Sequence, residues 1–283
     1  MAETADADAH VKIMSYNMHG FFQGSPAVTD IISQHYPDVI NLQEHWLTPF
    51  NLNKFDIFDD YFSFGCSAMS KTLETGVLRG RPFGGVMILI KKELRNITET
   101  IFCSERYAIV RIGNCVIVNV YLPYQGTKDR LLIVEDVLTD CLSWCERYNE
   151  CNFVVVGDFN VDLNRPLGDF SQYLDTLISK HELRRCDLLF NQQDKPTYHN
   201  LAPNQSSCID YILASTQAIV VSFDVLDPDI NFSDHYPIIA TCKMSAFGST
   251  KDMLHSCPSS NVLCYRWDYA DLVSFYQFTR VWL

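Results

Sequence analysis

Polar residues that could bind a metal ion or a phosphate follow short apolar runs at six places in the sequence. They are Asn17, Glu44, Tyr121, Asp158 with Asn160, Asp210, and Asp234 with His235. A carboxylate or carboxamide at the tip of a buried strand sits on a rigid element, and several such tips can converge on one ligand. Four converging carboxylates would repel one another without a cation. Oxygen ligands with amide neighbours favour Mg²⁺, or Mn²⁺, over zinc.

Each of these residues also has a purely structural interpretation. Asp or Asn after a strand is commonly a turn former or a helix cap, and His235 alone could be a core histidine. The set is more informative than its members. It combines candidate metal ligands, amide donors and a histidine with a potential Asp partner, so we interpret it as one site.

The elements that must position this site are short apolar runs rich in β-branched and aromatic residues. The runs of strand length are Val11–Tyr16, Val39–Leu42, Gly85–Ile90, Ala108–Ile112, Val116–Leu122, Phe153–Gly157, Ile209–Leu213, Ile219–Val225 and Ile238–Cys242. Several are apolar on both faces, which is typical of a sheet covered on both sides. Gly113–Asn114 predicts a tight antiparallel hairpin.

Helical patterns lie between the strands, at Thr29–His35, Asp129–Tyr148 and Asp169–His181. Strands and helices that mix without strict βαβ alternation favour a layered α/β sandwich over a Rossmann sheet or a TIM barrel. We expect one domain over residues 11–243, preceded by a disordered acidic segment, residues 1–10. A polar linker, residues 244–260, and a tail too short to fold alone, residues 261–283, would follow.

The motifs resemble, in order, those of the endonuclease/exonuclease/phosphatase superfamily, which includes deoxyribonuclease I, the apurinic endonucleases and inositol polyphosphate phosphatases. The matching segments are Met14–Asn17, Leu42–Glu44, Val120–Pro123, Gly157–Asn160, Ile209–Tyr211 and Ser233–His235. The resemblance covers residues 11–243. It implies a four-layer α/β (α+β) sandwich of the deoxyribonuclease I type, with two packed mixed β-sheets flanked by helices.

Within that superfamily, the chain looks most like the apurinic-endonuclease-like endonuclease domain of a non-LTR (LINE-type) retrotransposon. The segments that carry this likeness are Gly84–Val86, Pro196–Tyr198, Cys208–Ile212 and Tyr265–Asp268. In intact elements a reverse transcriptase domain follows the endonuclease. We therefore expect this chain to be truncated before that domain.

The resemblance also implies roles for the site residues. Glu44 would be the principal Mg²⁺ ligand, assisted by Asn17, with Asp234 close to the metal. Asp210 would orient His235. How the base role divides between an Asp and a His, and whether one metal ion or two are bound, stays open.

Three further residues of the set would act on the scissile phosphodiester. Asp158 would position or deprotonate the attacking water. Asn160 would donate a hydrogen bond to the phosphate, and Tyr121 would do the same or assist the leaving group. The function implied is Mg²⁺-dependent nicking of DNA.

Three alternatives remain. A phosphomonoesterase of inositol phosphates would use the same core, but Tyr211–Ser215 lacks the basic, aromatic character expected of its substrate loop. An RNA nuclease is a second alternative within the superfamily. A catalytically silent retroelement remnant is a third, and the complete set of candidate site residues argues against it.

The overall charge is an objection to a DNA substrate. The chain carries 22 Lys+Arg against 34 Asp+Glu, a formal net charge of −12, whereas nucleic-acid binders draw affinity from cations on phosphates. Part of the acidic excess lies in the tails and in the predicted metal site. The candidate phosphate contacts are Arg79, Arg81, Lys128 and Arg130. We expect a monomer that binds DNA weakly, with salt sensitivity and assistance from Mg²⁺.

The cysteines and the apolar runs indicate in which cellular compartment the protein works. The eleven cysteines include no CxxC pair, which favours reduced, mostly buried thiols over a disulfide framework. The sequence shows no signal peptide, and the longest nearly apolar run, Gly84–Ile90, is far too short to span a bilayer. We therefore expect an intracellular protein with no membrane partner. A nuclear location would follow only from the substrate.

Overall fold

A computed structural model describes residues 10–78, 80–165, 168–200, 205–215 and 219–243. The predicted linker, the predicted tail and Arg79 lie outside the described residues. So does the predicted N-terminal segment, except for His10, which is the first residue of strand β1. Within the described part of the chain, no helix combines the length and apolar character needed to cross a membrane.

The described residues form two mixed six-stranded sheets and a small hairpin. The first sheet has the order β13-β14-β1-β2-β4-β3, with β1 (His10–Asn17), β2 (Val39–Gln43), β3 (Tyr61–Cys66), β4 (Val86–Lys91), β13 (Val220–Val225) and β14 (Ile238–Lys243). The second has the order β5-β6-β7-β8-β12-β9, with β5 (Thr98–Cys103), β6 (Tyr107–Ile112), β7 (Cys115–Tyr121), β8 (Asn152–Asp158), β9 (Leu183–Arg185) and β12 (Asp210–Ser215). The hairpin pairs β10 (Tyr198–Asn200) with β11 (Gln205–Ser207).

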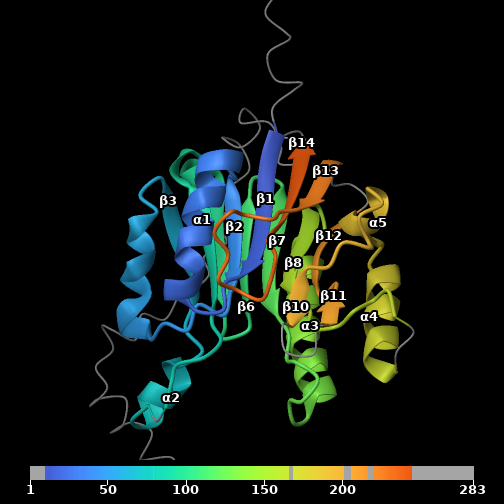
Figure 1. The fold of residues 1–283 in the computed structure, drawn as a ribbon. Coiled ribbons are helices and arrows are strands. Elements are labelled where there is room, and N and C mark those ends of the chain that lie inside the picture. Colours follow the sequence, from blue (N-terminus) through green and yellow to red (C-terminus); the bar gives the residue numbers. More distant parts are fainter. Residues whose placement is uncertain (1–9, 79, 166–167, 201–204, 216–218, 244–283) are drawn as a thin grey trace, which may run out of the picture.

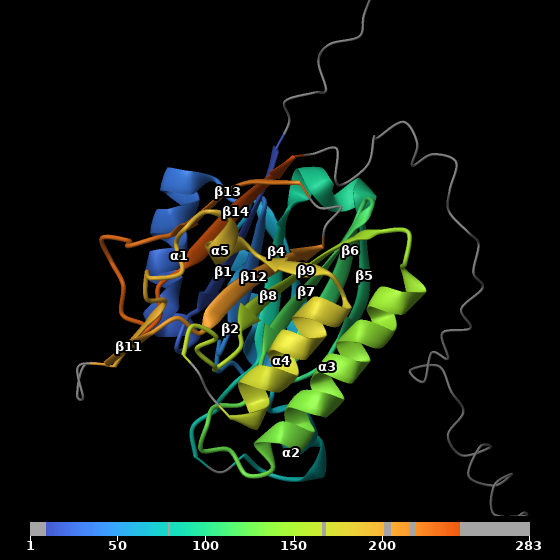
Figure 2. The same ribbon diagram turned by 90° about the vertical axis from the view of Figure 1, so that its right-hand side faces the viewer.

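Helices flank the two sheets. The α-helices are α1 (Phe21–His35), α2 (Ser70–Thr75), α3 (Arg130–Arg147), α4 (Asp169–Lys180) and α5 (Cys186–Leu189), and the 3-10 helices are η1 (Pro49–Ile57) and η2 (Lys92–Ile97). Helix α1 lies on the outer side of the first sheet, whereas α3 and α4 lie side by side over the second (Figures 1 and 2).

Three apolar clusters hold these layers together. The cluster between the sheets includes Ile88 of the first sheet and Val156 of the second. A second cluster packs α1, through residues such as Ile31, on the outer face of the first sheet. A third packs α3, through residues such as Val134, on the outer face of the second. The predicted four-layer sandwich of two mixed sheets and flanking helices is therefore confirmed.

A buried polar network also connects the sheets. The amide of Asn119 on β7 donates to the backbone oxygens of Leu42 on β2 (3.0 Å) and Met87 on β4 (3.1 Å). Its Oδ1 accepts from Nε2 of Gln43 at 2.7 Å. Because a buried polar group is costly when it lacks a partner, these bonds favour one alignment of the sheets.

The nine predicted strands are confirmed to within one or two residues, and so are the helices at α3 and α4. The hairpin at Gly113–Asn114 joins β6 to β7 as expected. The helix predicted to begin at Thr29 begins instead at Phe21 and continues through Pro26. The prediction was wrong because Gly24 and Pro26 resemble breakers. Gly24 is required by its packing, since a Cβ there would collide with Met18.

Five strands had no counterpart in the sequence analysis: β3, β5, β9, β10 and β11. Strands β3, β5 and β9 lie at sheet edges. Their side chains are mostly half-buried or exposed, so they lack the continuous apolar character of the central strands.

Candidate active site

The predicted site residues converge at one end of the two sheets. In the first sheet, Asn17 ends β1 and pairs in register with Gln43, which immediately precedes Glu44. In the second, Asp158 pairs with Asp210 on one side and with Tyr121 on the other. These pairings bring together strand ends that are far apart in sequence.

A buried acid–imidazole group forms the centre of the site. Nδ1 of His235 lies 2.9 Å from Oδ2 of Asp210, and its Nε2 lies 4.0 Å from Oδ2 of Asp158. All three residues are buried, with exposed fractions of 5%, 2% and 1%. One ligand atom from each lies within 4.8 Å of the other two. The structure thus brings together the Asp and His residues expected to share proton transfer.

Burial and charge change the proton affinities of this group. Burial, followed by the charge of Asp210, raises the pKa of Asp158 to about 8. Burial alone would lower the pKa of His235, but the charge and hydrogen bond of Asp210, with the charge of Asp158, raise it to about 10. The group therefore retains protons near neutral pH because it crowds carboxylates into a buried space.

Asn17 connects this group to Glu44. Its Nδ2 donates to Oε1 of Glu44 and to Oδ2 of Asp158, both at 2.9 Å. Its Oδ1 accepts the backbone N–H of His19 at 3.1 Å. In this arrangement the Asn17 amide holds the carboxylates of Glu44 and Asp158 in place. That Asn17 also binds the metal ion stays a prediction.

Two residues that the sequence analysis did not single out support the predicted ligands. Nε1 of Trp46 donates to Oε2 of Glu44 at 3.0 Å. Nδ1 of His19 lies 3.1 Å from Oδ1 of Asp234, and the His19 and Trp46 rings pack with centroids 4.6 Å apart. Each residue follows a predicted ligand by two positions, Asn17 for His19 and Glu44 for Trp46. That spacing was the available signal.

The backbone around Glu44 is unusual. Glu44 and Trp46 both have φ of 53°, in the left-handed region that non-glycine residues rarely occupy. Between them, the buried His45 accepts the N–H of Leu47 at Nδ1 and lies 3.0 Å from the carbonyl oxygen of Cys66 at Nε2. Burial lowers the pKa of His45 to about 4, so a neutral ring that donates from Nε2 fixes this turn.

The two predicted phosphate donors lie beside Asp158. The amide of Asn160 donates to Oδ2 of Asp158 at 3.1 Å and to the carbonyl oxygen of Leu122 at 2.8 Å. Burial, with the charges of Glu44 and Asp158, raises the pKa of the Tyr121 hydroxyl. The guanidinium of Arg106, also missed in the sequence, lies 5.8 Å from the Tyr121 ring centroid. Both donors are neutral groups at physiological pH.

The predicted DNA contacts differ in their surroundings. Arg81 and Lys128 are exposed. Arg130 is half-buried and donates to the backbone oxygens of Pro123 (2.9 Å) and Asn160 (2.6 Å). These bonds anchor the first residue of α3 to the turn that carries Asn160. Contact of Arg81, Lys128 and Arg130 with a nucleic acid stays a prediction.

The chemistry of the donor set fits a hard divalent cation. Glu44, Asp158, Asp210 and Asp234 present carboxylate oxygens, and Oδ1 of Asp210 is buried without a hydrogen bond from any described residue. A cation would offset both the burial and the negative charge of Asp210 that raise the pKa of Asp158. Carboxylates and an amide suit Mg²⁺ or Mn²⁺, with Glu44, Asn17 and Asp234 as the proposed ligands.

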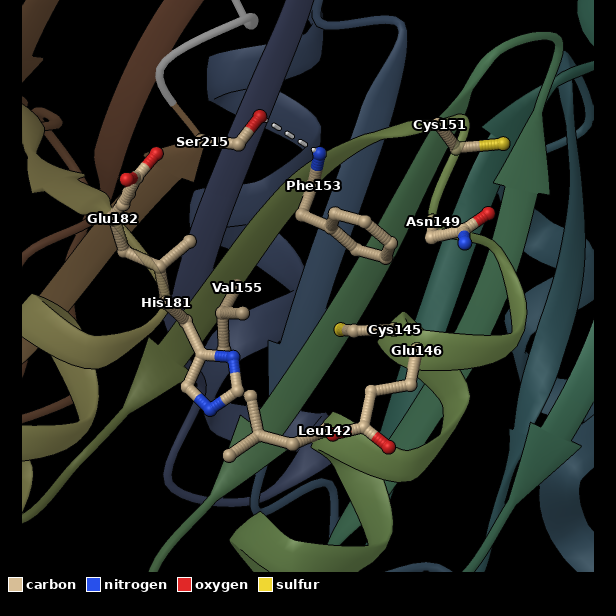
Figure 3. Close-up of a pocket in the computed structure, with 11 residues that line it drawn as sticks. Leu142, Cys145, Glu146, Asn149, Cys151, Phe153, Val155, His181, Glu182 and Ser215 are labelled. Atoms are coloured by element: carbon tan, nitrogen blue, oxygen red, sulfur yellow. Dashed lines mark hydrogen bonds between the residues drawn. The ribbon is translucent and has the colours of Figure 1, made fainter.

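A separate cavity of about 220 Å³ lies at the opposite ends of β8 and β12 (Figure 3). His181, Cys145 and Ser215 are among its lining residues, and the hydroxyl oxygen of Ser215 accepts the N–H of Phe153. None of the predicted site residues lines this cavity. We therefore assign the candidate chemistry to the opposite end of the sheets.

Comparisons with known proteins identify a family for the chain and solved structures that share its fold. Residues 14–235 match the model of the Endonuclease/Exonuclease/phosphatase family. No curated protein matches the sequence.

Solved structures share the fold at low sequence identity. The catalytic domain of APE2 from Xenopus laevis has a TM-score of 0.66 and 18% identity, covering 82% of this chain and 92% of that one. AP endonuclease LMAP from Leishmania major has a TM-score of 0.62 and 16% identity, covering 83% and 88%. The 3′ phosphatase NExo from Neisseria, solved with a product DNA hairpin, has a TM-score of 0.61 and 14% identity, covering 81% and 98%.

Proposed function

Because the chain belongs to the endonuclease/exonuclease/phosphatase family, we propose that it is a Mg²⁺-dependent endonuclease that nicks DNA. The observation that carries this proposal is the buried Asp210–His235 pair, with Nε2 of His235 4.0 Å from Asp158. Phosphodiester hydrolysis needs an acceptor for the proton of the attacking water and a donor near the developing charge. This group supplies both kinds of site within a few ångströms.

Asp158 is the proposed acceptor of the water proton. Its pKa, raised by burial to about 8, makes it a stronger base than an exposed carboxylate when it is ionised. Asn17 and Asn160 hold its Oδ2 by hydrogen bonds of 2.9 and 3.1 Å. Asp158 is therefore fixed in position while it takes the proton.

His235 is the proposed cationic donor to a phosphoryl oxygen. Asp210 occupies its Nδ1, which leaves Nε2 facing Asp158 and the proposed substrate position. The pKa of His235, raised to about 10 mainly by Asp210 against the effect of burial, keeps the ring protonated at neutral pH. The amide of Asn160 and the hydroxyl of Tyr121 would add neutral donors to the same phosphate.

A divalent cation held by Glu44, Asn17 and Asp234 would neutralise charge on the phosphoryl group and stabilise the leaving 3′ oxygen. Trp46 and His19 would orient its carboxylate ligands through their contacts with Glu44 and Asp234. These contacts belong to the protein alone and are in place before a substrate binds.

DNA is favoured over inositol phosphates by the surroundings of Asp210. The residues that follow it form strand β12, and every residue of that strand is buried. This segment therefore offers no exposed basic loop to grip a small polyphosphate.

We further propose an origin in the endonuclease domain of a non-LTR retrotransposon, whose reverse transcriptase would be the natural partner, and we expect a monomer. Motifs such as Gly84–Val86 and Cys208–Ile212 support that origin.

A plasmid assay tests the proposal. Purified protein with Mg²⁺ should convert supercoiled plasmid to open circles, and a chelator should abolish the conversion. Asp158→Ala and His235→Ala should lose it, whereas Asp175→Ala, at an exposed position on α4, should keep it.

Other outcomes would contradict the proposal. Robust nicking by both site variants would refute the site assignment. Release of phosphate from inositol phosphates, or cleavage of single-stranded RNA, in preference to DNA would identify another substrate class. A folded protein that shows no Mg²⁺ binding by calorimetry would be a catalytically silent remnant.

A further inference from the structure

Two cysteines meet where the edges of the two sheets face each other. Cys66 is the last residue of β3, the edge strand of the first sheet, and Cys103 is the last residue of β5, the edge strand of the second. Their Sγ atoms are 2.8 Å apart. Both residues are half-buried, so a small reagent can reach them.

The contact changes the acidity of the two thiols in opposite directions. The hydrogen bond from the Cys103 thiol holds the pKa of Cys66 at about 7, below the ordinary value of 9. The same bond raises the pKa of Cys103. Among the other cysteines of the described residues, burial raises each pKa. Cys66 is therefore the described cysteine richest in thiolate at neutral pH, and the thiolate is the reactive form.

We propose that Cys66 and Cys103 are a reversible redox site, which a hydroperoxide oxidises to a disulfide that joins the two sheets. This inference does not depend on the proposed nuclease activity.

The first step is attack on the peroxide. The Cys66 thiolate bonds to one peroxide oxygen, the O–O bond breaks, and the leaving hydroxide takes a proton to become water. Cys66 becomes a sulfenic acid. The negative charge that had retained the Cys103 proton is then gone.

The second step closes the disulfide. The sulfur of Cys103 loses its proton and attacks the sulfur of Cys66, the S–O bond breaks, and a second water leaves. Two thiols and one hydrogen peroxide thus give one disulfide and two waters. A dithiol reductant reverses the oxidation by thiol–disulfide exchange.

The cross-link would restrain the chain between the two edge strands. Residues 67–102, which include α2, β4 and η2, would become a closed loop, and closing a loop stabilises a fold mainly by restricting the unfolded chain. It would also fix the carbonyl of Cys66, which accepts from His45. The oxidised protein should therefore resist thermal unfolding.

The test treats the whole chain with mild hydrogen peroxide, alkylates the remaining thiols and maps peptides by mass spectrometry. We expect a peptide pair linked through Cys66 and Cys103, lost on treatment with dithiothreitol. The oxidised protein should unfold about 5–10 °C higher than the reduced protein. In Cys103→Ser, a sulfenic acid should accumulate on Cys66 and be trapped by dimedone.

Cys145→Ser is the matched control. Cys145 is half-buried like Cys66, lines the cavity shown in Figure 3, and has a pKa that burial raises to about 12. This variant should form the Cys66–Cys103 link normally. Free Cys66 and Cys103 after other cysteines have been oxidised, or a disulfide between two copies of the chain, would overturn the proposal. A rise in unfolding temperature that persists in Cys103→Ala would overturn the cross-link as its cause.

Discussion

Oδ2 of Asp210 lies 2.9 Å from Nδ1 of His235, although Asp210 is in a strand of the second sheet and His235 is in a segment that leads into the first. Asp210 begins β12 of the second sheet, and His235 lies just before β14 of the first. The contact fixes which imidazole nitrogen remains for other partners. It also supplies the negative charge that raises the pKa of the buried ring.

Replacing Asp210 by Asn should test this relationship. Asp210→Asn removes the charge, so the pKa of His235 should fall, and the DNA-nicking rate should drop by about 10²–10⁴-fold. The KM for plasmid should change far less. Kinetics and an NMR titration of the imidazole would measure both effects. Asp224→Asn, at an exposed ion pair with Lys195, is the control. A His235 pKa that does not move would contradict the proposed electrostatic coupling.

Cation binding should depend on pH in a defined direction. The pKa of Asp158 is raised to about 8, so the cation-free protein retains a proton there at neutral pH. A bound cation favours the ionised carboxylate and displaces that proton. The apparent affinity for Mg²⁺ should therefore rise with pH, by up to about tenfold per unit, and level off above about pH 8. Calorimetry over this range measures it. Asp158→Asn should flatten the dependence, and a flat wild-type profile would argue against proton displacement.

Trp46→Phe should separate the hydrogen bond from the packing of the ring. Phe retains an aromatic ring beside His19 but cannot donate to Oε2 of Glu44, a bond of 3.0 Å here. Loss of such a supporting bond typically weakens metal affinity by about 10–100-fold. A Mg²⁺ titration of nicking and of calorimetric binding would show the shift. Wild-type Mg²⁺ dependence in this variant would mean that Glu44 needs no support from Trp46.

Gly157→Ala should destabilise strand β8, which ends in Asp158. Gly157 has φ of 144° on β8, and a Cβ there would collide with the backbone of Val120 on β7. We expect a loss of roughly 3 kcal/mol or more in the free energy of unfolding. Gly168→Ala is the control, because no atom of the described residues lies near its Cβ position. Urea denaturation of both variants measures the difference, and equal stabilities would contradict the steric argument.

The exposed side chains of Arg81 and Lys128 should determine how steeply DNA affinity falls with salt concentration. Each phosphate contact contributes about one to the slope of log affinity against log salt. The double variant Arg81→Ala, Lys128→Ala should therefore lower that slope by about two and weaken binding at low salt. Lys180→Ala, at the exposed end of α4, should leave it unchanged. Fluorescence anisotropy with a labelled duplex would make the measurement. An unchanged slope would remove Arg81 and Lys128 from the interface.

The sequence was most informative where burial is complete. Central strands such as β1 and β8 are apolar on both faces because the sandwich covers both faces, so their positions were predictable. The edge strands β3 and β5 expose part of their surface and lack that signal. Helix α1 was predicted short because local conformational preference and tertiary packing conflict at Gly24 and Pro26.

The site was predictable in its residue types but not in its supporting contacts. The strand boundaries identified Glu44, which follows β2, and Asp210, which begins β12, because residues that adjoin a strand are held in a definite place. His19 and Trp46 depend instead on left-handed backbone at positions 19 and 46, where φ is 45° and 53°. Their spacing of two residues from Asn17 and Glu44 marks these positions but does not predict the left-handed turns. The anchoring role of Arg130 likewise depends on two carbonyl groups whose positions emerge only on folding.

The amide of Asn119 fixes the position of one sheet relative to the other. A shift of one sheet along the other would break the bonds of Asn119 to Leu42 and Met87, in addition to disturbing the apolar packing between the sheets. Asp158 and Asp210 lie in the second sheet, whereas Glu44 directly follows β2 and His235 precedes β14, both strands of the first sheet. Misalignment of the sheets would therefore separate the candidate site residues. Asn119 variants would also leave the carbonyls of Leu42 and Met87 buried without this donor, so we expect them to lose both activity and stability.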